Sequence, residues 1–178
     1  MESEGVCFES MHLATGMYIC EGGSLTMTKC TSTGDRIRVK GASLVMEDSR
    51  VFGCSGHGMQ CEGEGDVKLT RCTVEDNGSV GILIYGEHAS AELVDCVIRK
   101  NGSCGVLANL GMIMLRGGTI SENVSYGVHA LNSGTVTVAK AEEGKPQTVS
   151  KDNGNCRDWS TLEDGEIIGI PQEKIVTT

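Results

Sequence analysis

The chain has 178 residues, enough for one domain with a sizeable core. Aromatic residues make up only 3% and glycine is abundant (25 residues), so the core must be built from aliphatic side chains, methionine and cysteine. The net charge of −9 disfavours nucleic acid and anionic membranes as partners, and no apolar run approaches the roughly 20 residues of a membrane span.

The N-terminal segment MESEGVCFES is acidic and lacks the charged-then-apolar pattern of a signal peptide. The nine cysteines are an odd number, which disfavours a secreted disulfide framework. We therefore expect reduced thiols and an intracellular, cytoplasmic protein. Residues 1–15 are predicted to form a partial N-terminal coil, with VCF as a short strand.

From residue 16 onward the chain repeats itself. A short apolar strand begins at intervals of 20 to 24 residues, at Gly16, Arg36, Gly58, Gly81, Gly105 and Gly127. A second strand follows about ten residues later, as in LTMTKC and VKLTRC, and a third leads to an asparagine turn, as in TVEDN and VIRKN. Each strand alternates apolar and polar residues, which is the β period.

Three short strands per repeat cannot bury an apolar side alone, but stacked repeats can. The sequence therefore predicts an all-β fold: a right-handed parallel β-helix, or solenoid, of about six to seven coils with three short strands per coil. Residues 16–155 are assigned to these repeats.

Positions that were not used to align the repeats support the stacking. The second strand closes on a small residue in every repeat, namely Cys30, Ser49, Cys72, Cys96, Gly118 and Ala141. Glu75 is predicted to lie over Arg99, which would place opposite charges on neighbouring strands. Asn77, Asn101 and Asn123 are predicted to stack as a ladder at one corner.

Repeats of this form resemble the pectin-lyase-like superfamily of right-handed β-helices. More narrowly, they resemble the CASH-type repeats of sugar-acting proteins and of the substrate-binding β-helix in certain F-box proteins. The resemblance covers about residues 16–155. It implies the fold, and it leaves both polysaccharide and protein ligands open as expectations.

The last segment, residues 156–178, is assigned as a C-terminal cap. Trp159, the only tryptophan, and the EIIGI stretch at 166–170 are predicted to fold over the last coil as a lid. Because the ends of the stack are bare sheet edges with weak capping, self-association through the coil ends is a further expectation.

An enzyme hypothesis depends on Asp35 and His57. Gly56-His57-Gly58 matches one motif of polygalacturonase-type hydrolases, but the paired aspartates of that motif set are missing. Glycoside hydrolysis needs two carboxylates across the sugar, so we do not assign a catalytic residue and lean against catalysis.

Metal sites are also poorly supported by the sequence. Glu62, Glu64 and Asp66 form the best unmatched acidic cluster for calcium, which needs several converging oxygen ligands, and we interpret it as a solvated turn. No C-x-x-C pair is present for zinc. No cofactor is expected. Cys104 and Cys156 fall at turns, where they could be exposed and reactive.

The outer face of the first strand is the predicted binding surface. The alternation turns these residues outward: Tyr18, Arg38, Gln60, Leu83, Tyr85, Leu107 and His129. Exposed leucines on adjacent coils would make an apolar strip, which favours an interaction surface. The sequence thus predicts a non-catalytic binding or scaffolding module for protein partners. The alternative is a carbohydrate-active enzyme, either a hydrolase or a lyase, or a carbohydrate-binding domain.

Overall fold

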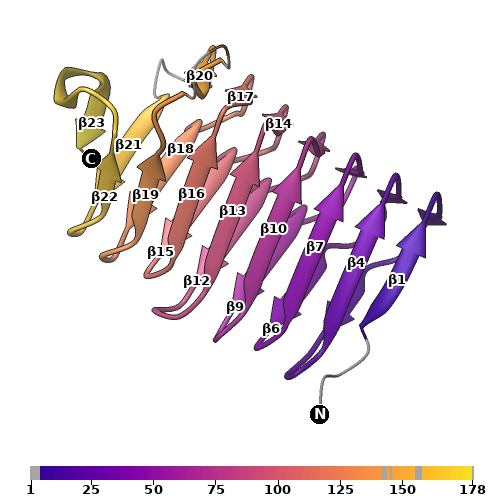
Figure 1. The fold of residues 1–178 in the computed structure, drawn as a ribbon. Helices are drawn as coiled ribbons and strands as arrows, with labels where there is room; N and C mark the ends of the chain where they lie inside the picture. Colours follow the sequence, from indigo (N-terminus) through magenta and orange to yellow (C-terminus); the bar gives the residue numbers. More distant parts are fainter. Residues whose placement is uncertain (1–4, 142–143, 145, 155–157, 178) are drawn as a thin grey trace.

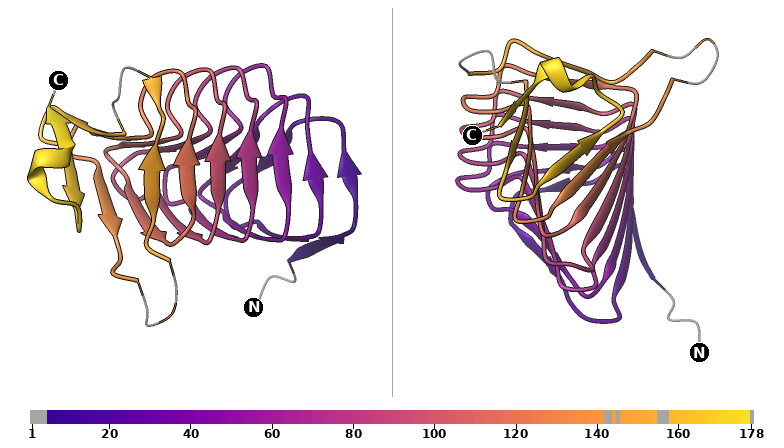
Figure 2. Two further views of the ribbon diagram at one scale, coloured as in Figure 1. Left: turned by 90° about the horizontal axis from the view of Figure 1, so that it is seen from above. Right: turned by 90° about the vertical axis from the view of Figure 1, so that its left-hand side faces the viewer.

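The computed structural model describes residues 5–141, 144, 146–154 and 158–177. Its strands form three parallel sheets, and the chain visits the sheets in turn as it winds (Figure 1). Seen from the C-terminal end, successive coils lie over one another around a common interior (Figure 2). The predicted parallel β-helix with three strands per coil is confirmed.

The three sheets are named here in the order in which a coil meets them. Sheet 1 contains β1 (Val6–Glu9), β4 (Ser24–Thr28), β7 (Ser43–Glu47), β10 (Asp66–Thr70), β13 (Ser90–Val94), β16 (Met112–Arg116), β19 (Thr135–Val138) and β22 (Glu166–Ile168). Sheet 2 contains β2 (His12–Leu13), β5 (Thr31–Ser32), β8 (Arg50–Phe52), β11 (Thr73–Glu75), β14 (Val97–Arg99), β17 (Thr119–Ser121) and β20 (Val149–Lys151). Sheet 3 contains β3 (Met17–Ile19), β6 (Ile37–Lys40), β9 (Met59–Glu62), β12 (Ile82–Tyr85), β15 (Val106–Asn109), β18 (Val128–Leu131), β21 (Trp159–Leu162) and β23 (Ile175–Thr177), the last preceded by the 3-10 turn η2 (Gln172–Lys174).

The core consists of the inward members of each strand, stacked in columns. In sheet 3 the two inward columns include Ile37 with Val39 and Ile82 with Ile84, all fully buried. Cys30, Cys72 and Cys96 close the second-strand corner and are at most 4% exposed. Because each coil lies one strand spacing from the next, about 4.8 Å, like side chains meet and fill the interior without aromatic bulk.

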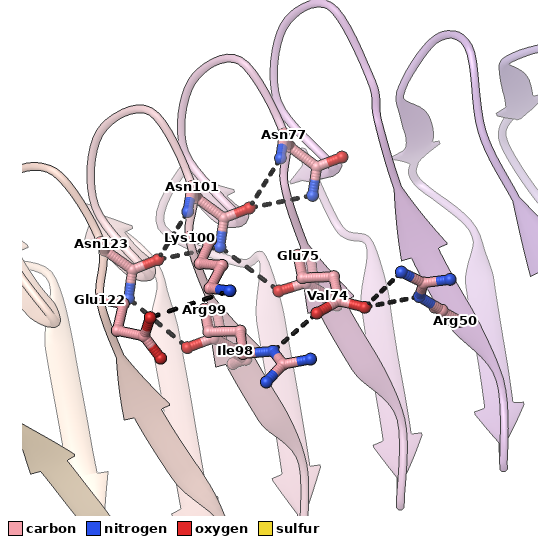
Figure 3. Close-up of polar contacts among 10 residues, drawn as sticks. All are labelled: Arg50, Val74, Glu75, Asn77, Ile98, Arg99, Lys100, Asn101, Glu122 and Asn123. Carbon is pink, nitrogen blue, oxygen red and sulfur yellow. Dashed lines mark hydrogen bonds and ion pairs between the residues drawn. The ribbon is translucent and has the colours of Figure 1, made fainter.

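An asparagine ladder runs along the corner that follows sheet 2 (Figure 3). The Nδ2 of Asn77 donates to Oδ1 of Asn101 at 2.9 Å, and Asn101 donates to Asn123 in the same way. The backbone N–H groups of Asn77 and Asn101 donate to the same oxygens. Asn153 continues the ladder, accepting from Asn123 at 2.8 Å. The predicted ladder is therefore confirmed and is one coil longer than expected.

The ladder explains why glycine precedes four strands of sheet 3, namely β9, β12, β15 and β18. A Cβ on Gly81 would lie 2.8 Å from Nδ2 of Asn101, and one on Gly105 would lie 2.7 Å from Nδ2 of Asn123. Real Cβ atoms do not approach so closely, so each buried asparagine requires a residue without a side chain beside it. The recurring glycine and the recurring asparagine are two parts of one packing arrangement.

The strand register shows that one residue was assigned wrongly to the predicted small-residue column. Thr119 of β17 pairs with Val149 of β20, so the residue that follows Gly118 in the small-residue column is Thr148. Thr148 is buried, whereas Ala141, the predicted member, is exposed. The prediction for Ala141 was wrong because extra residues lie between β19 and β20, and the repeat spacing could not show where the strand resumes.

The C-terminal segment winds as part of the stack. Trp159 begins β21, which pairs in register with β18, and β22 pairs with β19 on sheet 1. The predicted lid over the last coil is therefore wrong. A strand that is added to a parallel sheet makes its backbone hydrogen bonds and also buries the apolar residues that a lid would have buried. At the other end β1 pairs with β4, so the VCF strand is confirmed.

Within the described residues, no helix is long and apolar enough to cross a lipid bilayer.

Candidate functional site

The predicted binding surface is one continuous column on the outside of sheet 3. Consecutive parallel pairings place these residues side by side: Tyr18, Arg38, Gln60, Leu83, Leu107 and His129. We call this column the outer row. Tyr85 lies two residues beyond Leu83 on the same face of β12 and is 47% exposed.

The N-terminal part of the outer row is a polar network. The Arg38 guanidinium donates through Nε to Oε1 of Glu62 at 2.7 Å and lies over the Tyr18 ring, 5.2 Å from its centroid. Gln60 donates to Oε2 of Glu62 at 3.1 Å and accepts from Arg36 at 3.0 Å. These bonds fix the side chains, so this part of the face presents a preformed arrangement of donors and an aromatic ring.

The middle of the outer row is apolar. Leu83 and Leu107 are adjacent and half-buried, and the exposed Tyr85 flanks them. An apolar patch next to a fixed polar network is the usual composition of a protein interface, with an apolar centre and a polar rim. The predicted alignment of Leu83 with Leu107 is confirmed, but the sequence analysis expected both leucines to be exposed, and they are half-buried.

The C-terminal end of the outer row is covered. His129 is only 6% exposed, because the Tyr126 ring stacks on it with centroids 4.5 Å apart. Its Nδ1 is 3.2 Å from the carbonyl oxygen of Ser160. Burial lowers the pKa of His129, and the contact with Ser160 opposes that shift. The prediction that His129 belongs to an exposed surface was wrong, since alternation gives the side of a strand but not what lies over it.

The comparison with known families agrees with this architecture. The family model for the right-handed β-helix region matches residues 4–113, which is more than half of the chain. The chain belongs to the right-handed β-helix family. Neither the curated proteins nor the solved structures include a significant match to it. In this β-helix the pairing of strands continues past residue 113 to β23.

Asp35 and His57 of the β-helix lie on successive coils but have separate hydrogen-bond partners. Asp35 accepts from the backbone N–H of Arg36 at 2.8 Å, and His57 Nδ1 accepts from the N–H of Val80 at 3.3 Å. Burial, reinforced by Arg36, lowers the pKa of His57, which keeps the imidazole neutral near pH 7. Among the described residues no hydrogen bond joins the two, and the enzyme hypothesis that depends on them stays an untested alternative.

The three acidic residues that were considered as a calcium site do not share their contacts. Glu62 is paired with Arg38 and Gln60, and Asp66 accepts from the Ser90 hydroxyl. Glu64 is exposed in the intervening turn. In the part of the chain that the structure describes, no three His, Cys, Asp or Glu side chains are grouped so that they could hold a metal ion.

Six of the eight cysteines in the described part of the chain are buried, whereas Cys7 and Cys20 are exposed. Burial raises the pKa of Cys61 and of Cys96 to about 12, so both stay protonated. Cys104 is 5% exposed and its pKa is also raised by burial, so the prediction of an exposed, reactive thiol there was wrong. Cys156 lies outside the described residues.

A cluster of charged side chains that was only partly predicted from the sequence lies on sheet 2. Glu75 pairs with Arg99 as predicted, and it also binds Arg50 of the preceding coil. A similar trio on sheet 1 joins Lys68, Glu92 and Arg116. Arg50 was missed because it lies opposite Thr73 in register and reaches Glu75 diagonally. The sequence feature that could have revealed this contact is Arg50 itself, an arginine without a predicted partner on the coil before Glu75.

These ion clusters predict an acid-sensitive fold. Burial raises the pKa of Glu75, but hydrogen bonds from Arg99 and Arg50 outweigh it, and the net pKa lies below its usual value. The pKa of Glu92 is also lowered, by Arg116 and Lys68. Glutamates depressed in the folded state stabilise it above their unfolded pKa of about 4.3, and this contribution is lost as pH falls through the folded pKa.

We therefore expect the urea midpoint to fall between pH 6 and pH 3, and to fall less in Glu75→Gln, which cannot titrate at this position. Urea unfolding followed by circular dichroism at both pH values measures this. An equal fall in the native chain and in Glu75→Gln would show that Glu75 does not contribute.

Proposed function

We propose that this β-helix is a non-catalytic binding or scaffolding module for protein partners, using the outer face of sheet 3. The observation that supports it is the composition of the outer row: a fixed polar network at Arg38 and Gln60 continues directly into an apolar patch at Leu83 and Leu107. Binding to such a face requires little ordering of side chains, which favours affinity.

Polysaccharide binding is the second candidate, and a different feature favours it. Tyr18 and Tyr85 are both exposed on this face, 58% and 47%, with hydrogen-bonding side chains between them. Exposed aromatic rings separated by polar groups are suited to stacking on sugars. On this alternative the same face would be a carbohydrate-binding or carbohydrate-active surface, and Asp35 and His57 would be the first residues to test for catalysis.

A charge introduced into the apolar patch tests whether this face is a protein interface, because it should weaken binding only if partners contact the patch. Leu83→Lys is compared with the native chain in pull-downs from extracts of the source organism, quantified by mass spectrometry. We expect a defined set of proteins to be depleted about tenfold or more by Leu83→Lys, because loss of a central interface residue costs about 2 kcal/mol. The matched control is Thr137→Lys, which places the same charge outward on sheet 1.

Two outcomes contradict the proposal. If Thr137→Lys depletes the same proteins as Leu83→Lys, binding does not depend on sheet 3. If the native chain degrades any member of a panel of acidic polysaccharides and His57→Ala abolishes that activity, the module is an enzyme. Circular dichroism of each variant verifies that it is folded.

A further inference from the structure

The apolar patch on sheet 3 continues toward the C-terminal end of the stack. Leu131 of β18 and Leu162 of β21 are paired in register and half-buried. Both point outward, because Ala130 and Thr161 are the inward members of the same strands. We call the extended surface the apolar strip; it consists of Leu83, Tyr85, Leu107, Leu131 and Leu162. It runs from β12 to β21, three strand spacings apart, which corresponds to about 14 Å along the stack.

The charged residues next to the apolar strip are acidic. Strands β12, β15, β18 and β21 and the turns that lead from them into sheet 1 contain no lysine or arginine. Their acidic residues are Glu87, Glu163 and Asp164, all exposed and none in an ion pair with a described residue. Their histidines are the exposed His88 and the covered His129. These turns stack along one edge of the molecule, where the strands of sheet 1 begin, so the acids flank one side of the strip near both of its ends (Figure 1).

Basic residues elsewhere on sheet 3 and its turns do not cancel this charge. Those of residues 36–40 lie at β6, two strands before β12. In the turns that lead from sheet 2 into sheet 3, Lys100 lies 3.9 Å from Glu122. Beyond β21, Lys174 of η2 directly follows Glu173. Among the described residues the apolar strip is therefore bordered by net negative charge, as expected on a chain whose net charge is −9.

The strip lies on a sheet face, and this favours a helix as its occupant. The backbone groups of β12, β15, β18 and β21 are already paired within sheet 3, and Asn109, the polar side chain within the strip, accepts from Asn132 at 2.9 Å. An extended segment would therefore leave the backbone groups that face the strip without partners, whereas a helix pairs its own. A helix of about ten residues is about 15 Å long and carries one apolar row, which matches the strip.

We propose that the apolar strip docks a basic amphipathic helix of a partner protein. The apolar row of the helix covers the leucines of the strip, and lysine or arginine side chains along one flank face Glu87 at one end and Glu163 at the other. This inference rests on the protein-binding function proposed above and assigns the chemistry of the partner.

Fluorescence polarisation with synthetic peptides tests the proposal on the whole chain. The probe is a labelled peptide of about 15 residues with leucines at i, i+3, i+4 and i+7 and lysines on the flanks of that row. One comparison peptide carries glutamate in place of lysine, and the other has the same composition arranged with the strand period of two. We expect the basic helical peptide to bind at least tenfold more tightly than either, and its affinity to fall as salt increases.

Each alternative result would overturn the proposal in a different way. Equal binding of the glutamate peptide would show that charge does not select the partner. Equal binding of the strand-period peptide would assign an extended segment to the strip. If no peptide binds although Leu83→Lys depletes partners in the pull-down, the protein-binding function stands and the helical partner alone is wrong.

Variants test the acidic border separately from the apolar strip. Glu87→Gln/Glu163→Gln removes two exposed charges and no ion pair among the described residues, so we expect the fold to be retained by circular dichroism and the affinity for the basic peptide to fall about fivefold. The matched control is Glu9→Gln/Asp95→Asn, which removes two exposed acids at the end of sheet 1 strands, where the chain turns toward sheet 2. An equal loss in the control would show that the peptide responds only to net charge and would contradict a local site.

Discussion

Replacing Asn101 by alanine is expected to lower the free energy of unfolding by about 3 to 5 kcal/mol, because buried polar groups would lose their partners on both sides. The Oδ1 of Asn101 accepts from both Nδ2 and the backbone N–H of Asn77. Its Nδ2 donates to Oδ1 of Asn123. All three asparagines are at most 2% exposed, so water cannot replace these bonds. Urea unfolding monitored by circular dichroism measures the loss.

Lys100, the residue before Asn101, provides the control substitution for this prediction. Lys100 has the same left-handed backbone as other residues of its corner (φ 55°), which asparagine tolerates. Within the described part of the chain, its side chain pairs only with Glu122, at 3.9 Å on the surface. Lys100→Asn should therefore change stability by less than about 0.5 kcal/mol. A loss below about 1 kcal/mol in Asn101→Ala would show that the ladder is not a main support of the stack.

Gly105→Ala is expected to cost about 2 to 3 kcal/mol, since overpacking a close-packed interior forces backbone shifts. The added Cβ would lie 2.7 Å from Nδ2 of Asn123 and 2.7 Å from the carbonyl oxygen of Gly127. The second contact is with backbone, which cannot turn aside as a flexible side chain can. Thermal and urea unfolding of the variant measure the effect.

Gly56→Ala is the matched control for this substitution. A Cβ at Gly56 would meet no atom within 4 Å, and its backbone needs no left-handed conformation. We expect its stability to lie within about 0.5 kcal/mol of the native chain, or slightly above it. Should the two alanine variants lose stability equally, the cost would come from glycine replacement in general and not from contact with the asparagine ladder.

Several individual contacts were predictable because the distance between two residues in the sequence determines where they lie relative to each other in a stack of repeats. Glu75 opposite Arg99, the asparagine corner and the small-residue corner through Cys96 all follow from residues one repeat apart lying one strand spacing apart. The same logic placed Tyr18, Arg38 and Gln60 in one column. The prediction was wrong at Ala141, where extra residues between β19 and β20 shift the spacing.

The sequence by itself determined the winding, which side of each strand faces inward, and the register of the coils before the residues inserted between β19 and β20. Alternation and repeat length are properties of the chain, and the backbone hydrogen bonds of a parallel sheet turn them directly into columns. Only the tertiary structure decided what covers or joins the outward side chains. Tyr126 stacks over His129, and Arg50 reaches Glu75 diagonally. Both contacts depend on side-chain reach between different columns, which a one-dimensional repeat does not encode.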